Sequence, residues 1–319
     1  MNRLARVLLV VALAAGGAPA RAAAADPAAL DALTQRISDD LPSLADVGIT
    51  VVAPDPAANV VRVHVTGDVT RAARMLGDRY GETVDVVDGE AFKPLAGPPC
   101  VSQRTICGPV MRGGLELTGT TLGICSSGVE ARLNQTGEFG VITAGHCYGS
   151  GEIVTHGGVP LGPTLPRIFS GEVDAAFVTH SLGAPTFLPS NWVYYSNADR
   201  EHPVTAVQPI ATEAVGQSVC RTGRTTGPAC GSIIAVGATV VIGSVTLRNQ
   251  RIANTCALPG DSGGPFLSGG TFRGIASAGN YVGSGSSARC AANPFTTYSA
   301  ADRIRTALGV TILTSSPLL

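Results

Sequence analysis

The pattern that most limits the fold of this chain is the recurrence of glycine between short runs of valine and isoleucine, from about residue 100 to the C-terminus. Such runs are typical of short strands separated by turns, which favours all-β structure. The apolar stretch Ile233–Leu247 is interrupted by Gly237 and Gly243, so it is predicted to form paired strands rather than a membrane helix. The part of the chain from about residue 100 onward has about 210 residues, which suit two six-stranded barrels better than one small barrel.

The segment Gly260–Pro265 carries a serine that could act as a nucleophile. It reads Gly-Asp-Ser-Gly-Gly-Pro, and the glycines before and after Ser262 permit sharp backbone turns. The N–H groups of Gly260 and Ser262 can then point at one spot. A tetrahedral intermediate needs such donors for its negative oxygen. The segment is therefore a candidate nucleophile with its own oxyanion hole.

Two other segments could activate this serine. Thr143–Cys147 contains His146, a residue type that suits a general base, and the apolar segment Gly171–Val178 contains Asp174. In a Ser-His-Asp triad the histidine takes the hydroxyl proton and returns it to the leaving amine. The aspartate stays ionised and fixes the imidazole tautomer. We therefore predict that His146, Asp174 and Ser262 form a catalytic triad.

The order His, Asp, Ser and the motifs around it resemble those of the chymotrypsin-like serine endopeptidases, in particular the bacterial secreted branch with the streptogrisins and α-lytic protease. Other segments that match this branch are Arg112–Gly114, Cys220–Gly223, Thr225–Gly227 with Cys230, Cys256–Pro259 and Ala300–Gly309. The resemblance implies a protease domain over 112–319 made of two six-stranded antiparallel barrels. His146 and Asp174 would lie on the first barrel, Ser262 on the second, and the site in the crevice between them.

The resemblance also implies supporting roles. Asp261 is expected to be buried and to pair with Arg221, which would hold the oxyanion loop in shape. The hydroxyl of Ser277 is expected to support Asp174, although an ordinary loop serine is the alternative.

The resemblance implies a specificity pocket with walls from the segments 255–258, 276–279 and 296–298. The substrate-binding residues implied by the resemblance are Leu258, Ala276, Ser277, Ala278 and Gly279. No acidic residue stands where a pocket for lysine or arginine would need one, and Ala276 replaces the histidine of the glutamate-specific members. We therefore expect cleavage after apolar residues, with backbone groups of 276–279 pairing with the peptide as an added strand.

The eight cysteines are an even number and indicate an oxidising compartment. Eight cysteines allow 105 pairings. A zinc site is the alternative, but no close CxxC pair or histidine-rich cluster accompanies them. The family resemblance selects the pairs Cys125–Cys147, Cys220–Cys230 and Cys256–Cys290, which leaves Cys100 to pair with Cys107.

The N-terminal part divides into three segments. Residues 1–25 have a basic start, an apolar centre and small residues before a cleavage site, as in a secretory signal peptide, so we expect a secreted protein. Residues 26–95 are predicted to form a small α/β unit that resembles, in outline, the pro-segments of the same branch; an unrelated accessory domain is the alternative. Residues 96–111 are predicted to be a linker with the extra disulfide.

Helical spacing of apolar residues after Pro27 and again over 70–80 predicts two helices in the α/β unit. The predicted strands are 49–52, 60–65 and 83–87, with a turn at 54–56.

Charge excludes a nucleic-acid partner. Residues 26–95 carry a net −6, and residues 96–319 a net +2 spread over the whole stretch, which is no basic footprint. We expect protein or peptide substrates and the chain's own pro-segment as partners, a monomer, no membrane span and no metal or organic cofactor.

Two other functions were weighed. A catalytically silent copy that binds proteins through the same cleft would usually lack a triad residue or the oxyanion glycine, and this chain has them all. An esterase with a Gly-x-Ser-x-Gly elbow does not fit Gly260–Gly264 or the order of the triad.

The remaining histidines are expected to be solvated or loop residues: His64, His156, His180 and His202.

Overall fold

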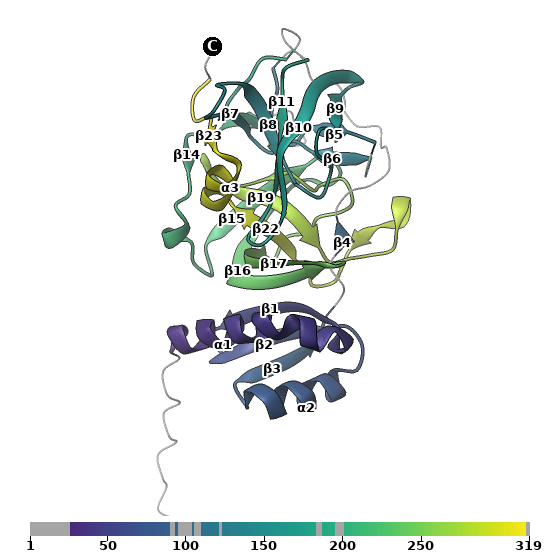
Figure 1. Cartoon of the computed structure of the whole chain (residues 1–319), viewed down its shortest axis with the longest axis vertical. Helices are drawn as coiled ribbons and strands as arrows, with labels where there is room; N and C mark the ends of the chain where they lie inside the picture. The colour runs from purple at the N-terminus through teal and green to yellow at the C-terminus, as the bar shows by residue number, and fades with distance from the viewer. Residues whose placement is uncertain are drawn as a thin grey trace, which may run out of the picture.

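The computed structural model describes residues 26–89, 93–94, 104, 110–120, 123–182, 187–194 and 201–316 (Figure 1). The predicted signal peptide and the predicted pair Cys100–Cys107 lie outside the described residues, as does most of the predicted linker. No helix among the described residues is long and apolar enough to cross a membrane.

The N-terminal segment forms a three-stranded sheet with two helices. Its elements are α1 (Pro27–Asp40), η1 (Leu41–Val47), β1 (Ile49–Asp55), β2 (Val60–Val65), α2 (Val69–Tyr80) and β3 (Val84–Asp88). The side chains of Asp26 and Asp68 accept backbone N–H bonds at the starts of α1 and α2, which satisfies donors that the helices leave unpaired. Alternate residues of β2 face a core that also contains Ile37 and Leu76. The predicted elements are all present.

One boundary differs from the prediction in this segment. β1 continues to Asp55, so the turn follows residue 55 instead of occupying 54–56. The extension has a physical reason, because β1 pairs along its length with β2 and Pro54 lies opposite Val61.

The next part of the chain forms an eight-stranded antiparallel sheet. Its order is β23-β7-β8-β11-β10-β9-β5-β6. The strands are β5 (Glu116–Thr118), β6 (Ile124–Ser126), β7 (Glu130–Leu133), β8 (Phe139–Thr143), β9 (Ile153–His156), β10 (Val159–Ser170), β11 (Val173–Thr179) and β23 (Val310–Ile312). The sheet exceeds the six strands predicted for this barrel, partly because the C-terminal β23 adds to β7. The fold class is as predicted.

The second barrel has the predicted six strands. The strands are β15 (Ser218–Gly223), β16 (Gly227–Ile242), β17 (Val245–Ala253), β18 (Pro265–Ser268), β19 (Thr271–Gly279) and β22 (Thr296–Ala300). They pair in the order β15-β18-β19-β22-β17-β16, and β15 also pairs with β16, which closes the ring. The stretch Ile233–Leu247 belongs to the β16–β17 hairpin, as predicted.

Short elements connect these sheets. They are β12 (Trp192–Tyr194) with β13 (Glu201–Pro203), β14 (Ala206–Val207), η3 (Ile210–Thr212), β20 (Tyr281–Val282) with β21 (Arg289–Cys290), and η4 (Gly285–Ser287). The helix α3 (Ala301–Leu308) follows β22 and buries Ile304 and Leu308 in the core of the first barrel. The C-terminal chain therefore ties the second barrel back to the first.

The N-terminal segment joins the second barrel through a continuous sheet. β1 pairs antiparallel with β16, with Val51 opposite Val240 and Val52 opposite Thr239 (Figure 1). Beside this seam the Ser38 and Thr239 hydroxyls lie 2.6 Å apart, and Arg248 pairs with Asp39 at 3.0 Å. Farther along the chain β4 (Lys93–Pro94) pairs antiparallel with β19, at Ala278 and Gly279.

Candidate active site

The structure brings the three predicted triad residues together between the two barrels. His146 lies in the turn after β8, Asp174 is the second residue of β11, and Ser262 lies in the turn before β18. The Ser262 Oγ is 2.9 Å from His146 Nε2, and His146 Nδ1 is 2.7 Å from Asp174 Oδ2. The His146 backbone N–H also donates to Asp174 Oδ1 at 2.9 Å. One carboxylate therefore holds both the backbone and the ring of the histidine.

Asp174 is fully buried and its carboxylate is held by several donors. Ser277 Oγ donates to Asp174 Oδ2, as the resemblance implied. Burial would raise the pKa of Asp174, but the charge of His146 and the hydrogen bonds from His146 and Ser277 outweigh it and hold that pKa below its usual value. The arrangement keeps the carboxylate ionised.

A further layer behind Asp174 was not predicted from the sequence. The Asp174 N–H donates to Ser299 Oγ at 2.9 Å, and Ser299 Oγ donates to Gln250 Oε1 at 3.0 Å. Ser299 belongs to β22 and Gln250 to β17, so the second barrel supports an aspartate of the first. No motif marks either residue, because the contact depends on how the barrels meet.

The turn at Gly260 has a backbone shape that favours glycine. Gly260 has φ of +100°, and a Cβ there would lie 2.3 Å from Thr225 Oγ1. The Pro259 carbonyl accepts from Thr225 Oγ1 at 2.7 Å, and the Asp261 carbonyl accepts from the Gly264 N–H at 3.0 Å. In a trans peptide the N–H points opposite to the C=O. The N–H groups of Gly260 and Ser262 therefore point away from those partners, as donors of an oxyanion hole must.

Asp261 and Arg221 form the predicted buried pair under this turn. Arg221 Nη2 lies 3.4 Å from Asp261 Oδ2, and both side chains are almost completely buried. Burial lowers the pKa of Arg221, and Asp261 acts in the opposite direction. Asp261 also accepts from the N–H groups of Thr225, Thr226 and Leu258. The carboxylate thus connects three segments around the nucleophile.

The predicted pocket residues lie directly against the nucleophile turn. Ser262 Oγ lies 3.3 Å from the Ser277 carbonyl oxygen, and the Gly263 N–H donates to the Ala276 carbonyl at 2.8 Å. Ala276 and Ala278 are fully buried, whereas Leu258 is partly exposed. The register of β19 on β22 places Ala276 opposite Tyr298. The segments expected to form one pocket are therefore neighbours.

Three of the four predicted disulfides lie within the described residues. Cys125 is bonded to Cys147, Cys220 to Cys230 and Cys256 to Cys290. The Cys125 and Cys147 sulfurs lie near His146, but a disulfide offers no thiolate to a metal.

Two histidines differ from the expectation of solvated or loop residues. His156 and His180 are buried, with exposed fractions of 2% and 5%. His156 Nδ1 is 2.7 Å from the Glu116 carbonyl, and His180 Nε2 is 3.5 Å from Glu130 Oε2. Their neighbours in sequence are polar or small, and only the closure of the first barrel buries them.

The arrangement of residues is matched by similarity to known proteins. A family model described as Trypsin matches residues 135–301, which include all three triad residues. The chain belongs to the trypsin family. It is 31% identical to Streptogrisin-C of Streptomyces griseus over 208 residues and 32% identical to Streptogrisin-A of the same organism over 206 residues. Each alignment covers 64% of this chain, but only 41% and 62% of the respective relative.

Solved structures of similar proteins each match about two thirds of this chain. Thermobifida fusca Protease A is 28% identical with a TM-score of 0.55, and the match covers 65% of this chain and 100% of that one. Nocardiopsis protease is 32% identical with a TM-score of 0.54, covering 64% and 99% respectively.

Proposed function

We propose that this protein is a secreted serine endopeptidase that cleaves peptide bonds through an acyl-enzyme on Ser262. The observation that carries the proposal is the continuous chain of close contacts from Ser262 through His146 to Asp174, in a member of the trypsin family. The predicted signal segment and the disulfides support export into an oxidising compartment.

The geometry supports a role for each residue. His146 takes the proton of the Ser262 hydroxyl as the oxygen attacks the carbonyl carbon of the substrate. The carbonyl oxygen becomes an oxyanion, for which the N–H groups of Gly260 and Ser262 are the donors. His146 then gives the proton to the leaving amine, and water hydrolyses the acyl-enzyme by the same steps. Asp174 stays ionised throughout and stabilises the imidazolium.

Segment 26–95 is proposed to be a pro-segment that assists folding and inhibits its own enzyme. Two contacts support this role. The pairing of β1 with β16 offers a template for a long hairpin of the second barrel. The pairing of β4 with Ala278 and Gly279 occupies the edge of β19 where a substrate would add as a strand. An unrelated accessory domain would have no reason to cover that edge.

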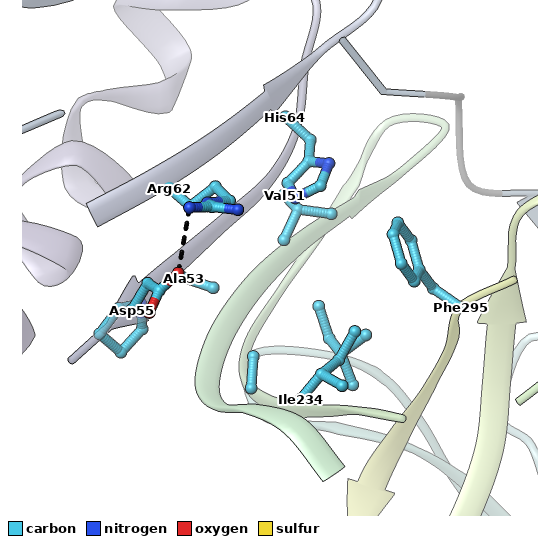
Figure 2. A pocket seen from close by; sticks show the side chains of 10 residues that line it. Val51, Ala53, Asp55, Arg62, His64, Ile234 and Phe295 are labelled. Carbon is cyan, nitrogen blue, oxygen red and sulfur yellow. Dashed lines mark ion pairs between the residues drawn. The ribbon is translucent and has the colours of Figure 1, made fainter. Parts of the chain in front are cut away.

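A cavity at the seam between the segment and the protease contains a titratable group. The cavity has a volume of about 250 Å³ and is lined by residues of both parts, among them Arg62, His64 and Phe295 (Figure 2). The His64 ring meets the Phe295 ring edge-on, with centroids 5.7 Å apart. Burial and then Arg62 lower the pKa of His64, and Asp85 opposes them. The seam therefore favours the neutral imidazole.

The proposed specificity is for an apolar side chain before the cleaved bond. Burying a leucine, methionine or aromatic side chain in the pocket contributes about 1.5–3 kcal/mol, which corresponds to roughly one to two orders of magnitude in kcat/KM if expressed in the transition state. Leu258, which is partly exposed, could narrow the opening.

A peptide library varied at this one position tests both the activity and its specificity. We expect the fastest cleavage after leucine, methionine or aromatic residues, and no cleavage by the Ser262→Ala variant purified in the same way. The variant controls for contaminating proteases. Fastest cleavage after arginine, lysine or glutamate would contradict the apolar assignment, and equal cleavage by both proteins would contradict the activity.

A further inference from the structure

Ser126, at the end of β6 in the first barrel, is bonded to the half of the site that contains the base. The preceding residue, Cys125, forms the disulfide with Cys147, which directly follows His146. The Ser126 carbonyl accepts a hydrogen bond from Thr143 Oγ1 at 2.9 Å, three residues before the histidine. Ser126 is fully buried. Its position is thus fixed relative to His146.

Ser126 is also bonded to the nucleophile turn of the second barrel, which is the segment Gly260–Gly264. The Ser126 N–H donates to the Ser262 carbonyl at 2.7 Å. The Ser126 hydroxyl donates to the Gly260 carbonyl at 2.8 Å and accepts from the Arg224 N–H at 2.9 Å. The Ser126 hydroxyl therefore donates its proton to the turn that contains Gly260, and it accepts a hydrogen bond from the loop that contains Arg224.

These bonds matter because Gly260 has no side chain to restrict its backbone. Its φ of +100° lies where glycine alone is comfortable, so sterics do little to hold its two flanking peptide planes. The Thr225 hydroxyl holds the plane before Gly260 through the Pro259 carbonyl. The Ser126 hydroxyl holds the plane after it through the Gly260 carbonyl. The first bond orients the Gly260 N–H, and the second anchors the following peptide plane to the first barrel.

We infer that the Ser126 hydroxyl is a positioning group for catalysis, which sets the oxyanion turn of the second barrel in register with the base on the first. The inference rests on the proposed function. It predicts that losing this hydroxyl weakens the stabilisation of the transition state and leaves ground-state binding of the peptide nearly unchanged. A misplacement of about 1 Å in such a site can cost about a hundredfold in rate.

The neighbouring Ser127 provides a matched control. It is equally buried, and its hydroxyl also makes several bonds, to the Arg112 carbonyl at 2.6 Å and from the Leu115 N–H at 2.8 Å. Both partners lie in the segment just before β5 of the first barrel, and neither belongs to the nucleophile turn. Ser126→Ala and Ser127→Ala therefore remove the same atom from adjacent buried sites.

The test compares both variants, expressed as the full chain and purified after secretion, on one peptide substrate. We expect Ser126→Ala to lower kcat by about 10- to 100-fold with little change in KM. The affinity for a peptide boronic acid inhibitor should fall by the same factor. Ser127→Ala should lower kcat far less. The Ser126→Thr variant, which keeps the hydroxyl, should recover part of the loss. Equal kcat in the two alanine variants, or a loss in KM alone, would overturn the inference. So would a Ser126→Ala protein that does not fold, because the defect would then be structural.

A second readout does not depend on activity. In a Ser262→Ala background, amide hydrogen exchange of the peptide 258–264 should be faster with Ser126→Ala than with Ser127→Ala. Unchanged exchange would overturn the positioning role even if the protein proved not to be a protease. Conversely, an inactive wild type with the expected exchange difference would reject the proposed function and keep the role of Ser126 in holding the turn.

Discussion

The buried carboxylate of Asp261 offers a severe test of how the nucleophile turn is held, by the single change Asp261→Asn. In the wild type, Oδ1 accepts from the N–H groups of Thr225 and Thr226 at 2.9 and 3.1 Å. Oδ2 accepts from Thr226 Oγ1 at 2.7 Å and the Leu258 N–H at 2.9 Å, and faces Arg221 at 3.4 Å. Asparagine keeps one oxygen and places an amide N–H₂ against three donors.

The expected loss follows from these contacts. Removing one member of a buried ion pair costs about 3–5 kcal/mol, because the remaining charge stays buried. Arg221 keeps another acceptor, the Cys256 carbonyl at 2.7 Å, so the lower end of that range is expected. About 3 kcal/mol is a large fraction of the roughly 5–15 kcal/mol by which a typical domain is stable. The urea dependence of unfolding, measured in the Ser262→Ala background to prevent self-digestion, gives the change in free energy.

Asp302→Asn is the matched control for this experiment. Asp302 pairs with Arg305 at 2.7 Å, but the two side chains are 27% and 53% exposed. Such surface pairs contribute about 0–1 kcal/mol. Equal losses from Asp261→Asn and Asp302→Asn would refute the reasoning that burial makes the first pair important.

Two further predictions concern the base and the seam. Asp174→Asn should lower kcat by about four orders of magnitude, because the histidine loses its required tautomer, and steady-state kinetics with the apolar library peptides measures it. Separately produced segment 26–95 should inhibit the protease most strongly above pH 6.5, the ordinary pKa of histidine, and lose affinity as the pH falls below it, since burial, the largest cause, lowers the pKa of His64 at the seam. The loss for one proton is at most about tenfold per pH unit. A His64→Gln segment, assayed on the same protease, should lack this part of the pH dependence; identical profiles for the two segments would contradict it.

The close approach of His146, Asp174 and Ser262 could be predicted from the sequence, because each lies in a short motif whose residues constrain one another. The glycines around Ser262 and the order of the three motifs can be read from the sequence and need no knowledge of tertiary contacts. The pairing of Cys256 with Cys290 and of Arg221 with Asp261 came from the family resemblance, and the structure contains both.

Other features could not be predicted because they depend on distant segments meeting. No sequence feature around Val51 or Val240 indicates that β1 pairs with β16. Ser126 and Ser299 look like ordinary serines of short strands, and their hydroxyls reach the site only because the two barrels face each other. The burial of His180, which directly follows β11, was not predicted for the same reason. Local patterns define the elements, whereas packing decides which polar groups they bury.

The central claim is that Ser262 is the acylated nucleophile, and intact-mass analysis after treatment with a fluorophosphonate tests it most directly. We expect one adduct per molecule, located on Ser262 by peptide mapping, and no adduct on the Ser262→Ala variant, which should stay folded because a single oxygen is removed. A catalytically silent binding protein would give no adduct on the wild type. Labelling of the Ser262→Ala variant above background, or an adduct mapped to another residue, would contradict the account.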